Sequence, residues 1–399
     1  MALHTRRQLL RSGAVAGTAI LAGCVFGFGG ETECETGRTV HQADATLPPD
    51  AAWPTYRHDD GNTGYAPEAS GPGGGDVGVA WRYSACTEAE SGVAVRDGHT
   101  AAGGLVVDAR TGEAAGGEWH GHMRTPTFEG GTLYVSTHDL EARDAGGGTV
   151  EWTFQTDVDA GALPAPTVAG GTVYVPGSID DPQVYAVRAD DGTERWRYRT
   201  PGDVGAPVAV HDGTVFVVDD AGTLTALAAA DGDLRWTRSL GVDSPGVVPV
   251  AVDGRLYLGS SEGVQARRAD DGAVVWTRND LGGSLAVGDD TVFVAGREAV
   301  TALDAAEGTE RWRNDALEVD PGAPAVGREA VYLGDAGRSD DSPVVALDRA
   351  TGEERWRVAT RSVFFGDYTR AGVVGVAVAG AVVYAATAPG DLYAFASQG

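Results

Sequence analysis

The chain has 399 residues, 42% of them hydrophobic, with 59 glycines and 18 prolines. So many turn-forming residues exclude a mainly helical protein and favour many short strands around a large core. The 57 acidic residues face only 30 basic ones, all of them arginine, and the formal net charge of −27 excludes the basic surface of a nucleic-acid-binding protein.

Residues 1–23 have the composition of an export signal. Residues 5–11 contain paired arginines and resemble a twin-arginine signal, and the uncharged stretch that follows is shorter than the roughly 20 apolar residues that span a bilayer. Residues 21–24 resemble a lipobox, which makes Cys24 the lipidated first residue of the mature protein. We predict an exported protein, lipid-anchored to the outer face of the cytoplasmic membrane. A cleaved soluble signal peptide and an ordinary N-terminus with a buried cysteine are the alternatives.

Residues 24–52 are predicted to form a flexible tether, because they are rich in Gly, Thr, Glu and Pro and have no periodic apolar pattern. Cys34 lies in this tether, and Cys86 lies at the start of the body. In an oxidising exterior these two cysteines either form a disulfide or remain free thiols. With Cys24 assigned to lipid, the remaining cysteines are too few for a four-thiolate zinc site.

Tryptophan marks an internal repeat along the body of the chain. Six tryptophans recur at intervals of 36 to 44 residues, each with an alanine ten residues earlier and a glycine four residues earlier. Within one repeat, residues 172–175, 184–188 and 195–199 have the β-branched and aromatic pattern of strands, and residues 165–168 add a fourth. Gly192 lies in the tight turn before the last strand. Four short strands in about 40 residues are typical of a propeller blade.

Counting the repeats predicts an all-β, eight-bladed β-propeller of four-stranded blades over residues 53–399. The last repeat ends before its tryptophan, and the strand around Trp81 supplies the missing one, so an N-terminal strand closes the ring. The predicted blades are 86–119, 120–155, 156–200, 201–240, 241–279, 280–315, 316–360, and 361–399 with 77–84. The tryptophans are predicted to pack between neighbouring sheets, with ligand platforms as the alternative role: Trp81, Trp119, Trp152, Trp196, Trp236, Trp276, Trp312 and Trp356.

The Tyr-Val, Ala-Leu-Asp, Gly and Trp positions of these repeats resemble those of the pyrroloquinoline-quinone-like (PQQ-like) β-propeller proteins, and residues 53–64 resemble the lead-in to such propellers. The family includes quinoprotein dehydrogenases and the lipoprotein scaffold of the bacterial outer-membrane β-barrel assembly machine. The resemblance implies that a dehydrogenase would hold PQQ and Ca²⁺ over the channel with a vicinal disulfide, carboxylates and a catalytic Asp. No Cys-Cys pair occurs in this chain, so no catalytic residue is carried over.

We therefore expect a non-enzymatic scaffold for envelope or exported proteins, with a quinoprotein-type dehydrogenase or cofactor-binding propeller as the alternative. The acid-rich, lysine-free composition is similar to that of proteins from salt-loving archaea, in which concentrated salt screens the self-repulsion of such a surface. This similarity implies an exported lipoprotein of haloarchaeal type.

Two places carry candidate site residues. His120 and His122 lie in one strand-like stretch, with His138 in a loop expected on the same face; they are a possible Zn²⁺ or Cu²⁺ set, or simply solvated histidines. The other place is the insertion at 361–370, whose aromatic and arginine side chains suit an interface or an anion clamp. Its alternative role is to bury its own phenylalanines. The candidate interface residues are Arg361, Phe364, Phe365, Tyr368 and Arg370.

Overall fold

The computed structural model describes residues 36–40, 48, 50–73, 75–85, 91–116, 124–146, 148–156, 162–177, 182–241, 246–317, 322–334, 342–365 and 368–398. All of them belong to one compact unit, residues 33–399. The regular elements of these residues are all β-strands, and no helix among them is long and apolar enough to cross a membrane. Cys24, Cys34, Cys86, Trp119, His120 and His122 lie outside the described residues.

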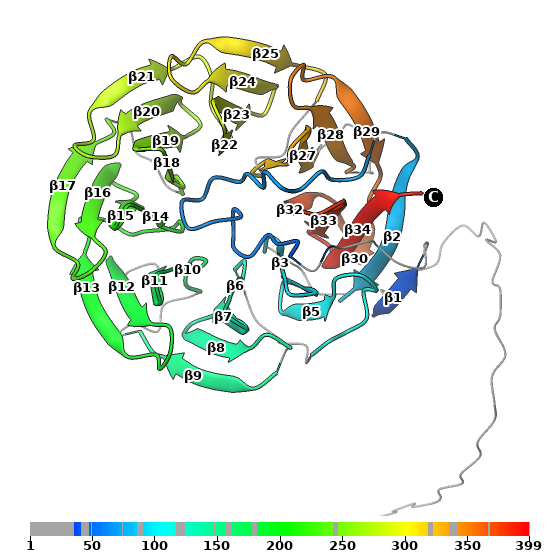
Figure 1. Ribbon diagram of the computed structural model, residues 1–399, viewed down its shortest axis with the longest axis horizontal. Helices are drawn as coiled ribbons and strands as arrows, with labels where there is room; N and C mark the ends of the chain where they lie inside the picture. Colours follow the sequence, from blue (N-terminus) through cyan, green and yellow to red (C-terminus); the bar gives the residue numbers. More distant parts are fainter. Residues whose placement is uncertain are drawn as a thin grey trace, which may run out of the picture. The chain divides into compact units, whose positions relative to one another are not determined.

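Successive antiparallel sheets stand around a ring like the blades of a propeller (Figure 1). Six of these sheets are four-stranded, one has a fifth strand added, and one has three strands among the described residues. This arrangement confirms the predicted eight-bladed β-propeller. Blades 1 to 4 consist of β3 (Ala94–Arg96), β4 (His99–Ala102) and β5 (Leu105–Asp108); β6 (Thr127–Glu129), β7 (Thr132–Ser136), β8 (Leu140–Asp144) and β9 (Val150–Phe154); β10 (Thr167–Ala169), β11 (Thr172–Pro176), β12 (Gln183–Arg188) and β13 (Glu194–Arg199); and β14 (Ala209–His211), β15 (Thr214–Val218), β16 (Thr223–Ala228) and β17 (Leu234–Ser239).

The second half of the ring repeats the same order. Blades 5 to 7 consist of β18 (Val250–Val252), β19 (Arg255–Gly259), β20 (Val264–Arg268) and β21 (Val274–Arg278); β22 (Ser284–Gly288), β23 (Thr291–Ala295), β24 (Val300–Asp304) and β25 (Glu310–Asn314); and β26 (Ala325–Val326), β27 (Ala330–Gly334), β28 (Val344–Asp348) and β29 (Glu354–Val358). Blade 8 consists of β32 (Val373–Ala379), β33 (Val382–Thr387), β34 (Asp391–Ser397) and β2 (Val77–Ser84). A separate hairpin, β30 (Val363–Phe365) and β31 (Tyr368–Arg370), lies between blades 7 and 8 in the sequence.

The ring closes in blade 8, where β2 pairs antiparallel with β34 from Val77–Ser397 to Ser84–Asp391. The predicted closure by an N-terminal strand is therefore confirmed. A fifth strand, β1 (Gly37–Val40), pairs with the outer edge of β2. The structure differs here from the expected tether, because four of its residues are fixed in the sheet by main-chain hydrogen bonding.

Neighbouring blades are joined by the tryptophan and glycine of the repeat. A Cβ built on Gly232 in blade 4 would stand 2.8 Å from the ring of Trp196 in blade 3, so only glycine leaves room for the indole. Its φ of +77° also favours glycine. The same close approach recurs at Gly112/Trp81, Gly192/Trp152, Gly272/Trp236, Gly308/Trp276 and Gly352/Trp312.

Most of these indoles also bond to the next blade. Trp196 Nε1 donates to the carbonyl of Ala229 at 3.1 Å, and Trp81, Trp152, Trp276 and Trp312 make the equivalent bond at 3.0 to 3.2 Å. Trp236 Nε1 is buried without a partner. Each indole, Trp356 included, also packs against an aromatic residue on the second strand of its own blade, as in Tyr174–Trp196. The tryptophans thus lie within the contacts between blades.

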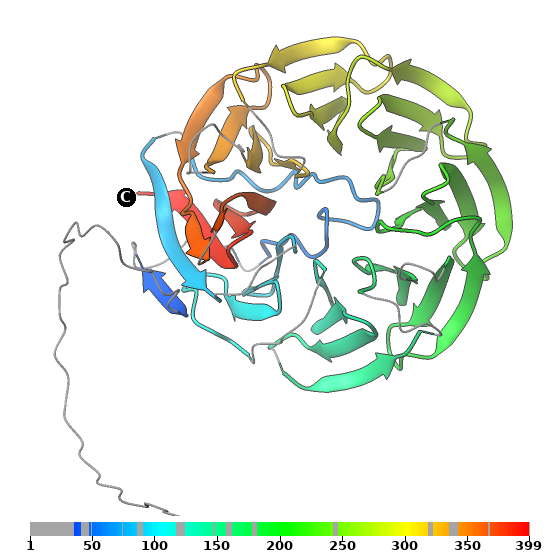
Figure 2. The same cartoon turned by 180° about the vertical axis from the view of Figure 1, so that it is seen from behind.

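Residues 53–71, here called the channel segment, run across the middle of the ring (Figures 1 and 2). Their main chain bonds to the innermost strand or first turn of seven blades, counted among the described residues. The pairs are Trp53 with Val95, Pro54 with Phe128, Asp60 with Val210, Gly61 with Ala251, Thr63 with Val287, Gly64 with Val326, and Gly71 with Gly380. A Cβ on Gly61 would lie 2.3 Å from the Ala251 oxygen, which shows how closely the segment fits the ring.

Candidate functional site

The order of the strands gives the ring two different faces. Within a blade the strands alternate in direction, so the first and third turns lie at one end and the second turn at the other. The second turns share their end with the connections that lead from one blade to the next. We call this end the crossing face and the opposite end the turn face.

The turn face consists of tight turns and is spanned by the channel segment. Asp97, Asp212, Asp253 and Asp289 have φ between 46° and 51° in the turns after the first strands, as two-residue hairpins require. The channel segment bonds to the innermost strands next to these turns, as the pair of Asp60 and Val210 shows. The turn face therefore consists of short turns, and the channel segment covers its centre.

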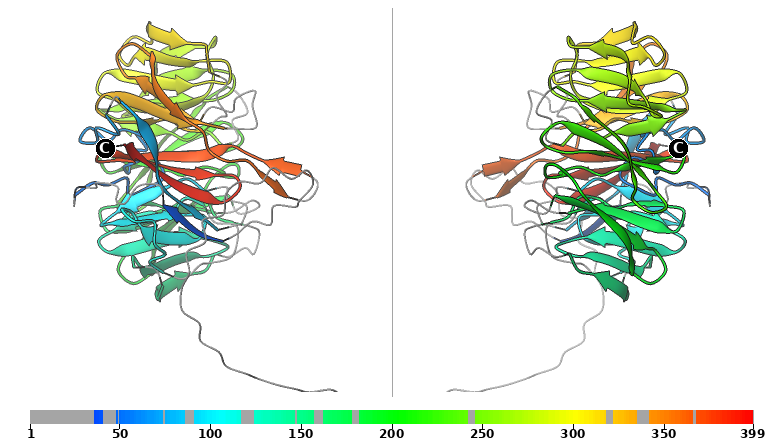
Figure 3. Two further views of the ribbon diagram at one scale, coloured as in Figure 1. Left: turned by 90° about the vertical axis from the view of Figure 1, so that its right-hand side faces the viewer. Right: turned by 90° about the vertical axis from the view of Figure 1, so that its left-hand side faces the viewer.

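The crossing face carries the longest described projection of the ring. Strands β30 and β31 pair antiparallel, with Phe365 opposite Tyr368 and Phe364 opposite Thr369. Figure 3 shows this hairpin extending beyond the ends of the blades on one side of the ring. The predicted insertion at 361–370 is thus a hairpin on the crossing face. The side chains of residues 364–370 lie outside the described ones.

Arg361 precedes this hairpin and is held inside blade 8. Its guanidinium donates to both carboxylate oxygens of Asp391, at 2.5 and 2.7 Å, and to Ser84 Oγ at 2.8 Å. The side chain of Asp391 is fully buried, and the bond to Asp391 raises the pKa of Arg361. Arg361 therefore fastens the base of the hairpin to the closing strands.

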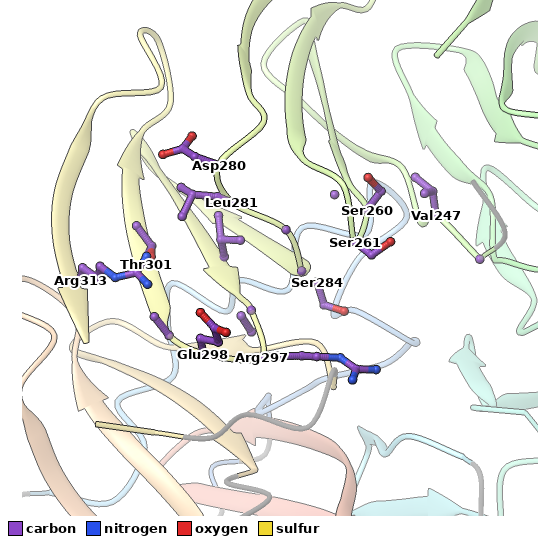
Figure 4. A pocket seen from close by; sticks show the side chains of 18 residues that line it. Val247, Ser260, Ser261, Asp280, Leu281, Ser284, Arg297, Glu298, Thr301 and Arg313 are labelled. Carbon is purple, nitrogen blue, oxygen red and sulfur yellow. The ribbon is translucent and has the colours of Figure 1, made fainter. Parts of the chain in front are cut away.

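A cavity of about 590 Å³ opens on the crossing face between blades 5 and 6. Figure 4 shows Arg297 and Glu298, from the turn between β23 and β24, beside Arg313 of β25 and Asp280. The Arg278 guanidinium lowers the pKa of Asp280 to about 2. Arginines, carboxylates and hydroxyl groups give this cavity a polar lining.

Sequence reasoning did not single out this cavity. Arg297, Glu298 and Arg313 stand in an acid- and arginine-rich chain without a recognisable spacing. Their position in the repeat was the one sequence signal for this site. Arg297 and Glu298 fall in the second turn of blade 6, and Arg313 falls in its outer strand. Only the packing of blade 5 against blade 6 brings them to one cavity.

The predicted histidine set is not assembled by the described residues. His138 is exposed in the turn between β7 and β8, which places it on the crossing face as expected. Its proposed partners, His120 and His122, are outside the described part of the chain. Within that part, no group of three or more His, Cys, Asp or Glu side chains is placed to hold a metal ion.

Two features of this chain differ from the PQQ and Ca²⁺ site that the resemblance to quinoproteins implies. The sequence has no adjacent cysteines for a vicinal disulfide. The channel segment also occupies the middle of the ring, with hydrogen bonds of 2.7 to 2.9 Å to seven blades. The middle of the ring is therefore filled by the protein's own main chain.

A closed ring of Trp-linked blades defines a PQQ-like β-propeller. The family model described as outer membrane protein assembly factor BamB matches residues 78–203, 137–279 and 260–399. Because these matches together cover most of the chain, the protein belongs to this family.

Individual relatives match over shorter stretches. The BamB of Yersinia pestis is 30% identical over 177 residues, covering 40% of this chain and 44% of that protein. The BamB of Escherichia coli K12 is 34% identical over 149 residues, covering 31% and 36%. The quinohemoprotein alcohol dehydrogenase ADH-IIG of Pseudomonas putida is 25% identical over 206 residues, covering 49% and 25%. Each match thus spans less than half the length of the relative.

Solved structures support the same fold. BamB from Moraxella catarrhalis superposes with a TM-score of 0.64 at 19% identity, covering 81% of this chain and 98% of that one. The quinohemoprotein alcohol dehydrogenase from Comamonas testosteroni gives 0.68 at 15% identity, covering 89% and 82%. At such low identity the likeness shows the fold alone. An assembly factor and an alcohol dehydrogenase both have this fold.

Proposed function

We propose that this protein is an exported, lipid-anchored propeller that serves as a scaffold for envelope or exported proteins. The observation that supports this most is the channel segment, which bonds to seven blades and spans the site where a propeller enzyme would hold its cofactor. A ring fixed in this way presents rigid surfaces and needs little reorganisation on binding. Membership of the BamB family supports the same proposal.

The crossing face is the proposed docking surface. It carries the β30–β31 hairpin and the cavity lined by Arg297 and Arg313, whereas the turn face has short turns. Aromatic residues and arginines, which occur in the sequence of this hairpin, are residue types enriched in interface hot spots. A partner that contacts this face would meet both features.

Site-specific photo-crosslinking in native membranes at high salt tests the docking face. A crosslinker at Arg297, on the crossing face, is compared with one at Asp270, an exposed residue of blade 5 on the turn face. We expect a recurrent protein adduct from position 297 and none from position 270. Equal adducts from both positions, or none from either, would contradict the proposed face.

The hairpin is tested separately by replacing Phe364 and Phe365 together with Ala. If both rings contact the partner, the melting temperature stays close to that of the wild type while crosslinking from position 297 is lost. A loss of several kcal/mol in stability would instead place the two rings in a core. Thr369→Ala serves as the control variant, because Thr369 lies opposite Phe364 on the other strand of the same hairpin.

Lipid anchoring depends on Cys24 in this proposal. Cys24→Ala is expected to release the protein from the membrane fraction, whereas Cys34→Ala leaves it attached. Retention of the Cys24→Ala protein by the membrane would rule out the anchor.

A quinoprotein dehydrogenase remains the second candidate, because ADH-IIG shares 25% identity over 206 residues with this chain. Absorbance spectra of the purified protein, before and after addition of PQQ and Ca²⁺, separate the two proposals. A stoichiometric quinone spectrum would favour the enzyme, and its absence together with a crosslinked partner favours the scaffold.

A further inference from the structure

Arg57 is a buried arginine of the channel segment, and it has no carboxylate partner among the described residues. Its exposure is only 4%, its Nη1 donates to the carbonyl of Leu285 at 3.0 Å, and its guanidinium lies 5.3 Å from the centre of the Tyr56 ring. Its Nε is buried and has no hydrogen-bond partner. One N–H of the charged group is therefore buried without an acceptor from the protein.

The side chain of Arg57 points into the channel. The main chain of the channel segment bonds to Val287 of β22, whereas Arg57 reaches Leu285, two residues nearer the crossing face. Asn62 behaves in the same way, since its Nδ2 donates to the carbonyls of Val208 and Pro249, which precede β14 and β18. Both side chains thus extend inward from the segment.

Other polar atoms of the same segment are also unpaired. Trp53 Nε1 and Asn62 Oδ1 are buried without partners, on side chains that are 1% and 0% exposed. Buried polar groups are nearly always hydrogen-bonded, so several orphans on one short segment indicate bound solvent or ions. Asn62 also holds a φ of +59°, a strained conformation that the close fit of the segment imposes.

The nearby carboxylates form no ion pair with Arg57 among the described residues, and Asp59 lies 3.7 Å from His58 instead. Asp59 accepts bonds from the main chain and the hydroxyl of Thr63, and Asp60 has a pKa raised by its own burial and by Asp59. By contrast, the equally buried Arg267 donates from all three nitrogens, to Gln265 and to the carbonyls of Gly272 and Ser239. A buried cation without such partners is costly, and a bound counter-ion removes that cost.

We propose that Arg57 Nε binds a small monovalent inorganic anion, of the halide class, inside the central channel. The anion supplies the missing acceptor and the missing charge together, which a water molecule alone does not.

The direct test is a crystal of the full chain grown or soaked in sodium bromide, with anomalous diffraction at the bromine edge. We expect an anomalous peak at hydrogen-bond distance from Arg57 Nε, in the channel. If no anomalous peak lies beside Arg57 Nε, and the density there shows only water or no atom, the proposal is overturned.

A solution test uses melting temperatures in sodium chloride and in sodium gluconate at equal ionic strength. The wild type should melt a few degrees higher in chloride, because a ligand of the folded state stabilises it, and Arg57→Met should lose this difference. In gluconate the variant should be at least as stable as the wild type, since an uncompensated buried charge has been removed. A chloride effect of the same size in Arg57→Met would contradict the assignment.

The matched control is Arg328→Met. Arg328 contacts the same segment from blade 7, at Pro67 and Glu68, but its side chain is 57% exposed and already paired. This variant should keep the chloride-specific rise. Loss of the rise in both variants would assign it to the fit of the segment and not to an anion at Arg57.

Discussion

The contact between Trp196 and Gly232 is the residue-scale unit from which the ring is built. The indole lies against the turn of the next blade and donates to Ala229 there, while Tyr174 packs against it from its own blade. Glycine serves two purposes at position 232, because it has a positive φ and leaves the space that the indole fills. Repeated around the ring, this contact joins sheets that share no main-chain ladder.

Gly232→Ala should therefore be far more harmful than the same change at another left-handed glycine. Gly213, with φ +67° and open space around it, is the matched control, and Gly213→Ala should cost about 1 kcal/mol for its backbone conformation alone. Gly232→Ala adds the clash with Trp196, and we expect about 1–3 kcal/mol more. Denaturant unfolding at high salt measures both. Equal losses would show that the indole does not depend on this gap.

An ion pair in blade 6 gives a pH-dependent prediction. Arg311 donates to both oxygens of Asp290, at 2.9 and 2.7 Å, and lowers the pKa of Asp290 from 3.8 to about 2. The pKa of Asp290 is lower in the folded state than in the unfolded state. The contribution of this ion pair to stability is therefore present above about pH 4 and is lost as the pH falls towards 2. It is small, since the Asp290 side chain is 75% exposed.

Arg311→Gln should return the pKa of Asp290 towards 3.8, whereas Arg355→Gln, in the next blade, should leave it unchanged. Carboxyl chemical shifts followed by NMR at low salt measure this pKa in both variants. An unchanged Asp290 titration in Arg311→Gln would mean that the pair does not form in solution.

Blade 8 shows how elements from the two ends of the chain stabilise one another. Strand β2 completes the sheet of β32, β33 and β34, and β1 adds a fifth strand outside the ring. Arg361 bonds across these elements, to Asp391 at the start of β34 and to Ser84 at the end of β2. Closure of the ring therefore depends on β2, while β1 only covers its outer edge.

Changes in the two N-terminal strands, β1 and β2, should have very different effects on stability. Replacing residues 37–40 by a Gly-Ser sequence is expected to lower the melting temperature only slightly. Trp81→Ala in β2 should cost about 3–5 kcal/mol, because the indole is 1% exposed and joins blade 8 to blade 1. If loss of β1 proves as destabilising as Trp81→Ala, β1 belongs to the closure itself.

At the scale of the whole molecule, charge and closure act together. A net charge of −27 on the whole chain produces strong self-repulsion at low ionic strength. The Debye length falls from about 10 Å in 0.1 M salt to about 3 Å in 1 M salt, so concentrated salt screens much of it. The channel segment opposes opening of the ring by bonding to seven blades.

We expect the melting temperature to rise steadily from 0.1 M to several molar salt, with sodium gluconate as well as with sodium chloride. This general screening differs from the halide-specific rise proposed for Arg57, which appears only in the comparison between the two salts. A melting temperature independent of gluconate concentration would show that the acidic surface needs no screening.

The sequence by itself determined the features that recur locally. The spacing of Trp, Ala and Gly, the β-branched runs and the Asp-Gly turns predicted eight blades and the closing strand around Trp81. These signals are local because each strand, turn and blade is specified within about 40 residues.

Only the tertiary structure decided which distant residues meet. Arg57 and Leu285 are 228 residues apart, and Arg361 meets Asp391 and Ser84 only after the ring has closed. The path of the channel segment and the cavity beside Arg297 likewise depend on contacts between blades. Unlike the Trp–Gly contacts, these contacts follow no sequence period, because burial and charge pairing are set by the closed ring and not by neighbouring residues.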